Sequence, residues 1–236
     1  MDSPVHSSKS KSEQKTLYVT LSDFLRNNRV AVLILFAVIV LAVIGVAVGT
    51  AIKDGQTKAA AASLEKLDAD YAAYSSEQDA TKKAELEKSF VVSADKTAKQ
   101  WNGKYAAQKA LAYKAKIDES NKDWSSAEKE WLSLLSSSSG SYLAPVALQG
   151  AATAAEEQGA FNRSLADYKK LVDKYASTTI GIPHAYFSIG RLSEGTKDYA
   201  GALAAYQKIV STWPDSDWTK LATDRIIFLK SSGLVK

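Results

Sequence analysis

Hydrophobic positions recur at intervals of three and four residues between Pro183 and Pro214, the spacing of amphipathic helices. The pattern breaks once, between residues 193 and 198, so we predict two antiparallel helices joined by a tight turn. Gly190 is small where the helices must approach closely, and Tyr206 is expected to fill the space beside it. The stripe residues are Tyr186, Ile189, Gly190 and Ser193 in the first helix and Tyr199, Ala202, Tyr206 and Ile209 in the second.

The same pattern recurs twice upstream in register. A shift of 38 residues places Tyr168 on Tyr206, and a further shift of 37 places Trp131 on Tyr168. Alternating β-branched residues are nearly absent outside residues 30–52, so the predicted fold class is all-α. The aromatic residues expected in the core of the repeats are Trp124, Trp131, Phe161, Tyr168, Tyr199 and Tyr206.

The period and its small and aromatic positions resemble the tetratricopeptide repeat (TPR) family. The resemblance implies an α-solenoid of about three helical hairpins within residues 101–236. Residues 56–76 and 81–100 also have helical patterns but do not register with the repeat, so residues 53–100 are expected to form a linker and an atypical helical pair. The stripe that begins at Trp218 has no second helix after it, which predicts a C-terminal capping helix.

Val30 to Ile52 contains no charged residue over 23 positions and would extend roughly 34 Å as a helix, enough to cross a hydrocarbon core. We predict a retained transmembrane helix. A cleaved signal peptide is the alternative, but its apolar run is shorter and begins nearer the start of the chain. Gly45 and Gly49 form a small-xxx-small pair that could be a transmembrane dimer contact, although glycine is also common in single spans.

The tail, residues 1–29, is predicted to lie on the cytoplasmic side. Its first 16 residues are rich in serine and lysine, which favours disorder. Leu17, Leu21, Phe24 and Leu25 then share a face, so a short helix could lie on the membrane surface or simply lead into the span. Arg26 and Arg29 adjoin the span and favour an N-in, C-out orientation.

Composition narrows the function classes. The net charge is only +4 and no basic block is interleaved with aromatics, so nucleic-acid binding is not expected. The chain has no cysteine and two histidines, of which only His184 lies in the repeats, and it has no phosphate-binding loop or nucleophile motif. We therefore expect no catalytic residue, no metal site and no cofactor, and a chain that is not an enzyme.

The first helix of each repeat leaves one face free, which predicts a partner-binding groove for peptides or proteins. Glu119, Glu156 and Glu194 share one register position near the C-terminal ends of their helices, where a negative charge opposes the helix dipole. They are a functional acidic row or ordinary solvated glutamates, and Phe187 is the best candidate for an exposed aromatic. The predicted groove residues are Lys109, Lys116, Glu119, Gln149, Thr153, Glu156, His184, Phe187, Arg191 and Glu194.

The layout of a short tail with the sequence 24–29 against the span, one N-terminal helix and a TPR domain resembles the YfgM-like ancillary subunits of the SecYEG translocon of bacteria. The resemblance implies a single-pass inner-membrane protein with a periplasmic domain, beside the Sec translocon, which passes exported chains to periplasmic chaperones. A scaffold for cell division or outer-membrane assembly and a ligand-binding accessory of a transporter are the alternatives. Self-association is a further option.

Overall fold

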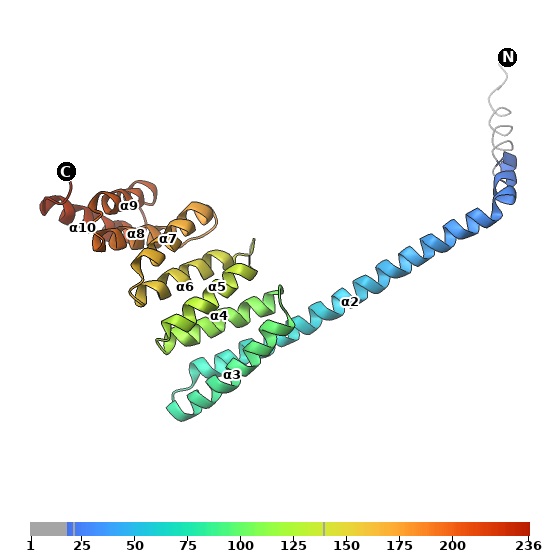
Figure 1. Cartoon of the computed structure of the whole chain (residues 1–236), viewed down its shortest axis with the longest axis horizontal. Helices are drawn as coiled ribbons and strands as arrows, with labels where there is room; N and C mark the ends of the chain where they lie inside the picture. Colours follow the sequence, from blue (N-terminus) through green and yellow to red (C-terminus); the bar gives the residue numbers. More distant parts are fainter. Residues whose placement is uncertain (1–17, 21, 139) are drawn as a thin grey trace, which may run out of the picture. The chain divides into compact units, whose positions relative to one another are not determined.

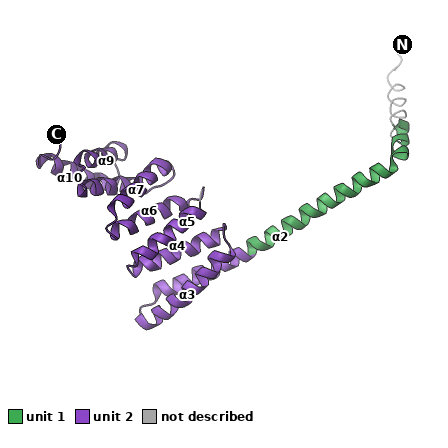
Figure 2. Ribbon diagram, in the orientation of Figure 1, with its two compact units in different colours: residues 1–58 green, residues 59–236 purple. Residues whose placement is uncertain are grey.

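The computed structural model describes residues 18–20, 22–138 and 140–236, and within them the secondary structure is entirely helical. The chain divides into two units, residues 1–58 and residues 59–236 (Figure 2). The predicted all-α class and its TPR-type repeat are confirmed. The helices are α2 (Arg29–Ser76), α3 (Ala80–Gln100), α4 (Tyr105–Ser120), α5 (Trp124–Ser137), α6 (Leu143–Glu157), α7 (Phe161–Tyr175), α8 (Ile182–Gly195), α9 (Tyr199–Thr212) and α10 (Asp217–Ser231).

Helix α2 is a single helix of 48 residues. The expected linker beginning at residue 53 was therefore wrong, because the predicted helices at 30–52 and 56–76 are one helix. Residues 53–58 contain no proline, and their one glycine, Gly55, costs a helix only about 1 kcal/mol. An apolar window of α2 has a mean hydropathy of 3.3 and none of it is buried within the protein. By length and composition α2 can cross a membrane, and a signal sequence near the N-terminus would pass the same test.

Residues 18–20 and 22–27 before α2 are also helical. Leu17 and Leu21, half of the predicted amphipathic face, lie outside the described residues, as does the predicted disordered stretch 1–16. A turn at Asn28, whose side-chain amide donates to the carbonyl of Phe24 at 3.0 Å, separates this helix from α2.

In the second unit, consecutive helices from α3 to α10 pack against one another as a stack of hairpins (Figure 1). The hairpins α4–α5, α6–α7 and α8–α9 are the three copies expected from the sequence, and α10 follows them. The atypical pair is also present. It consists of residues 59–76 of α2 and helix α3, whose Leu67, Tyr74, Phe90 and Ala94 share a core cluster with α4.

The close approach predicted at Gly190 is confirmed. Tyr206 is completely buried, and a Cβ atom placed on Gly190 would lie 2.6 Å from its Cζ. Trp131, the register equivalent of Tyr206, is also buried, but its ring packs against Gly150 on the first helix of the next repeat, where a Cβ would lie 2.6 Å from Cδ2. The aromatic knobs therefore pack within a hairpin and between hairpins.

The aromatics that begin the second helices are less buried than predicted, although Tyr199 does pack against the core cluster of α9 and α10. Phe161 is 51% exposed, and Trp124 and Tyr199 are half-buried. Each is the first residue of its helix, directly after a turn, so the neighbouring helix covers only part of the ring. The aromatics two turns further on, Trp131, Tyr168 and Tyr206, are the ones that fill the core.

The turn inside each repeat has the same backbone conformation. Lys122, Gly159 and Lys197 all adopt positive φ, at 59°, 73° and 64°. Asp123 and Asp198 follow and cap the second helices by accepting hydrogen bonds from the backbone N–H groups of Ser126 and Gly201, at 3.1 and 2.9 Å. The middle repeat has Ala160 at this position, so α7 lacks the side-chain cap that α5 and α9 have.

We expect Ala160→Asp to raise the free energy of unfolding by about 1 kcal/mol, because Ala160 already has the backbone angles of a capping aspartate (φ −83°, ψ 55°, against −81° and 71° at Asp123). Urea denaturation of the purified full chain measures the change. Ala160→Asn should give a similar gain and Ala160→Leu none. Equal stability of the aspartate and leucine variants would contradict the assignment.

A candidate partner-binding surface

The first helices of the hairpins and the last helix, α4, α6, α8 and α10, lie next to one another. Helix α4 contacts α6, and α8 contacts α10. Side chains join α6 to α8: Gln149 Nε2 lies 3.4 Å from His184 Nδ1, and Arg191 forms an ion pair with Glu156. The free faces of these four helices are called the first-helix surface below. All ten predicted groove residues lie on α4, α6 and α8.

The three registered glutamates are all engaged by neighbouring helices. Glu119 accepts a hydrogen bond from Nε1 of Trp131 at 2.7 Å, and Glu194 accepts one from the hydroxyl of Tyr206, also at 2.7 Å. Both carboxylate oxygens of Glu156 accept from the guanidinium of Arg191. Both readings made from the sequence were therefore incomplete, because these side chains link helices instead of facing solvent freely. The partners supply the positive charge and donors that offset the unfavourable helix dipole.

The surroundings of Glu194 stabilise its ionised form. Burial alone would raise its pKa, but the hydrogen bonds from Arg225 and Tyr206 outweigh burial and lower it. Nε of Arg225 lies 3.0 Å from Oε1 of Glu194, and its Nη2 also contacts this carboxylate. Burial and the hydrogen bond to Glu194 raise the pKa of Tyr206, so the hydroxyl keeps its proton and donates it to the carboxylate.

Among the described residues, the first-helix surface has two pockets that contain predicted groove residues. The larger, which we call the Glu119 pocket, has a volume of about 510 Å³ between α4, α5 and α6. A second pocket of about 330 Å³ lies at α8 and α10. The Glu119 pocket is lined by Lys116, Glu119, Trp124, Trp131, Val146, Gln149, Gly150 and Thr153, and the second pocket by Phe187, Arg191, Glu194, Tyr206 and Arg225.

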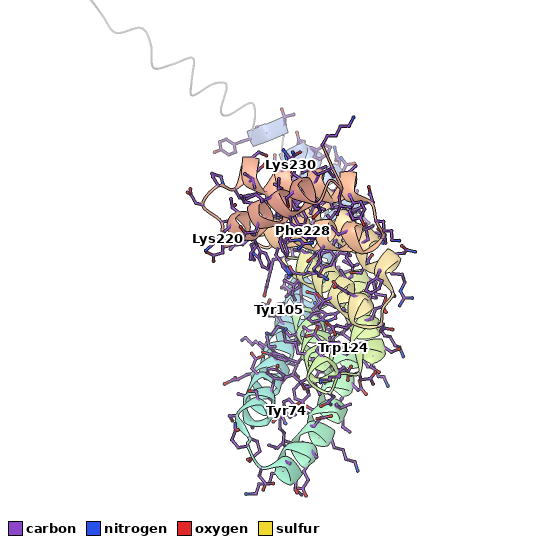
Figure 3. The ribbon with its side chains drawn as sticks, turned by 90° about the vertical axis from the view of Figure 1, so that its left-hand side faces the viewer. Tyr74, Tyr105, Trp124, Lys220, Phe228 and Lys230 are labelled. Carbon is purple, nitrogen blue, oxygen red and sulfur yellow. The ribbon has the colours of Figure 1, made fainter. Side chains whose placement is uncertain are left out.

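The structure thus brings Lys116, Glu119, Gln149 and Thr153 together in one pocket and Phe187, Arg191 and Glu194 in the other. Trp124 was missed as a lining residue because its aromatic character led to a core assignment. It is the first residue of α5 and is labelled in Figure 3. Arg225 was missed because the pattern of α10 was interpreted only as a cap.

The remaining predicted groove residues have contacts of their own. Lys109 Nζ lies 4.1 Å from the centre of the Tyr113 ring. The ring of His184 lies 4.6 Å from that of Trp218, and burial together with the nearby charge of Arg191 lowers its pKa. Its neutral form is therefore favoured, which suits a packing role.

Phe187 is not the exposed aromatic that the sequence predicted. It is half-buried, with ring centres 5.5 Å from Tyr206 and 5.2 Å from Trp218. Helix α10 causes the difference, because its Trp218 lies across the first turns of α8. Phe187 still lines the second pocket.

Acidic side chains also gather at the end of α4. Burial and the negative charges of Asp123 and Glu130 raise the pKa of Asp118 from 3.8 to about 6. Among the described residues, no group of three or more His, Asp or Glu side chains is arranged to hold a metal ion. The raised pKa is therefore best understood as a cost to stability.

We expect Asp118→Asn to be more stable than the natural chain at pH 7 and equally stable near pH 3.5. Between 3.8 and about 6 the folded chain holds more protons at Asp118 than the unfolded chain does, so the free energy of unfolding falls as pH rises through this window. The amide variant does not pay this cost, which is about 1 kcal/mol once solvent screening is allowed for. Urea titrations at the two pH values measure it, and a gain that is the same at both would contradict the assignment.

Known proteins that are similar to this chain contain the same kind of repeat. The tetratricopeptide repeat family model matches residues 184–216, which include most of α8 and all of α9. The chain is also similar to a TPR repeat-containing protein of Treponema pallidum (strain Nichols), with 28% identity over 133 residues, or 56% of this chain. The chain covers 55% of that relative, about half of its length. Residues 184–216 therefore match a tetratricopeptide repeat, and the helices around it form a TPR-type stack.

Proposed function

We propose that this chain is a single-pass, membrane-anchored protein-interaction module of the bacterial envelope, which binds other polypeptides on its first-helix surface. The TPR-type stack supports the interaction role, because such repeats present extended surfaces that bind peptides and proteins. The relative in Treponema pallidum is named for the same repeat. The nature of the two pockets, lined by both charged and aromatic side chains, suits recognition of polypeptides.

The exposure of a long apolar helix supports the membrane anchor. The side chains from Val30 to Ile52 are nearly all exposed, including Leu33, Phe36 and Leu41 at about two-thirds of their area. Each exposed apolar side chain of this size costs about 1.5–3 kcal/mol in water. Lipid removes this cost, and a helix satisfies its own backbone hydrogen bonds there. Arg26 and Arg29 adjoin the apolar run and favour an orientation with the tail in the cytoplasm and the repeats in the periplasm.

The absence of cysteine allows a direct test of this topology. In intact spheroplasts, a membrane-impermeant maleimide should label the full chain carrying Ser177→Cys, whereas Ser22→Cys should react only after lysis. The chain should also stay in the membrane pellet after alkaline carbonate extraction, at its full mass. A soluble chain shortened by about 50 residues would show instead that the apolar run is a cleaved signal peptide.

For the partner, we propose the Sec translocon and the exported chains and periplasmic chaperones around it. The proposal rests on the resemblance in layout to the YfgM-like subunits. Affinity purification of the full chain from solubilised membranes distinguishes the options. Many exported polypeptides with translocon subunits would support it, one or two folded proteins of another machine would indicate a scaffold, and a transporter subunit would indicate a solute-uptake accessory.

A further inference from the structure

Two of the three registered glutamates form an ion pair with an arginine from the next helix of the first-helix surface, which we call the closing arginine. Arg191 on α8 contacts both carboxylate oxygens of Glu156 on α6, with Nη2 to Oε2 at 2.8 Å. Arg225 on α10 binds Glu194 on α8 in the same two-pronged way, through Nε at 3.0 Å and Nη2. The side chains of Glu156 and Glu194 are left only 15% and 12% exposed.

Glu119 lacks this closing arginine. The position in α6 that corresponds to Arg191 is Thr153, and its short side chain is 3.1 Å from the hydroxyl of Tyr168. The nearest basic group to Glu119 is Lys116 on its own helix, with Nζ 3.8 Å from Oε2. The side chain of Glu119 remains 24% exposed, against 15% for Glu156 and 12% for Glu194.

The space that an arginine would fill is the Glu119 pocket, which is also the larger of the two pockets on this surface. Two indole rings, those of Trp124 and Trp131, line it beside the carboxylate. Indole faces attract cations, and Lys116 Nζ already lies 5.6 Å from the centre of the Trp131 ring. An anion would meet the Glu119 carboxylate and the two indole rings, with the mobile, exposed ammonium of Lys116 as its one positive partner among the lining residues. The pocket therefore favours a positively charged guest that displaces Lys116.

We propose that the Glu119 pocket binds an arginine side chain of a partner polypeptide, which takes the place that the chain's own arginine takes in the other two pairs. The inference rests on the proposed interaction function and gives that function a chemical specificity. A guanidinium can donate two parallel hydrogen bonds to a carboxylate, whereas an ammonium acts as a point charge. Without a guest, Lys116 pairs with Glu119. Its side chain is 53% exposed, so it can move into solvent when the guest arginine binds.

The probe is a capped pentapeptide, acetyl-Gly-Ala-Arg-Ala-Gly-amide, added to the full chain in detergent micelles. The chain is labelled with 5-fluorotryptophan, and ¹⁹F NMR follows the five tryptophans, with Trp124→Phe and Trp131→Phe used to assign two of the resonances. We expect the Trp124 and Trp131 resonances to shift with the arginine peptide. A peptide with citrulline, the uncharged analogue of arginine, should bind at least about tenfold more weakly. Equal binding of the two would overturn the proposal.

Two glutamate variants separate the pocket from general charge effects. Glu119→Gln should weaken binding of the arginine peptide at least about tenfold. Glu128→Gln is the matched control, because Glu128 is already bound by Arg163, at 3.2 and 3.1 Å, and does not line the pocket. The control should leave binding unchanged, and equal losses in both variants would show that binding depends on net charge alone.

Lys116→Gln and Thr153→Arg test the mechanism. Removing Lys116 should strengthen binding of the arginine peptide several-fold, because the internal competitor is gone. Thr153→Arg should abolish binding, because it supplies the missing internal arginine, with helicity unchanged by circular dichroism. If the chain instead binds a glutamate peptide more tightly than the arginine peptide, and Lys116→Gln weakens that binding, the arginine assignment is overturned. The proposed interaction module is not affected by this outcome. That module is tested separately by the partners captured from membranes.

Discussion

Tyr206→Ala is expected to lower the free energy of unfolding by about 3–5 kcal/mol, because it removes a fully buried ring from the core of the third hairpin. The substitution empties the space beside Gly190 and also removes the hydroxyl that donates to Glu194. Because repeat stacks are stabilised by contacts between neighbours, we expect α8, α9 and α10 to unfold before the rest of the stack.

Urea denaturation followed by circular dichroism and by the fluorescence of Trp213 and Trp218 measures this loss. Tyr206→Phe keeps the ring and should cost only about 1 kcal/mol, for the hydrogen bond. Tyr199→Ala, a half-buried tyrosine on the same helix, is the positional control and should cost clearly less than Tyr206→Ala. Similar losses at residues 199 and 206 would show that Tyr206 is not the centre of this hairpin.

Gly190→Val is expected to destabilise the chain by about 3 kcal/mol through overpacking. Even a Cβ at this position would lie 2.6 Å from Cζ of Tyr206, and the valine methyl groups would reach further into the ring. Tyr206 is fully buried, and its hydroxyl is bonded to Glu194, so the ring is held in place from both ends. Helix α8 must therefore shift away from α9, which disturbs its packing against both α7 and α9.

Gly195→Val in the same helix is the control for Gly190→Val, because nothing lies within 4 Å of a Cβ at Gly195. It should change stability by less than about 1 kcal/mol. Combining Gly190→Val with Tyr206→Ala tests the contact itself, since the valine then enters the cavity left by the ring and the two losses should not add. Additive losses would mean that the two residues do not share the space.

The repeat could be predicted because its signal is local and repeated. Gly190 and Tyr206 lie on facing stripes of one hairpin, so the spacing within each helix was sufficient to place them together. Lys116, Glu119, Gln149 and Thr153 could be placed on one surface for the same reason, since their register is counted along single helices. None of these inferences needed the angle between successive hairpins.

The parts that could not be predicted depend on how hairpins stack. Arg191 reaches Glu156 and Arg225 reaches Glu194 across 35 and 31 residues of sequence. Whether a side chain spans that gap depends on the rotation between neighbouring first helices, which the sequence period does not specify. Phe187 is covered for a related reason, because the position of α10 brings Trp218 over it. The continuity of α2 was missed because a change from apolar to polar residues is not itself a helix stop.

The proposed role of the first-helix surface is to hold other polypeptides beside a membrane. The most direct measurement is photo-crosslinking in intact cells from Val146, which is 43% exposed and lines the Glu119 pocket, compared with Lys169, which is exposed on the second helix α7. We expect polypeptide adducts in the membrane fraction from position 146 that are much stronger than those from position 169 and are lost with Thr153→Arg. Equal yields from the two positions, unchanged by Thr153→Arg, would contradict the claim.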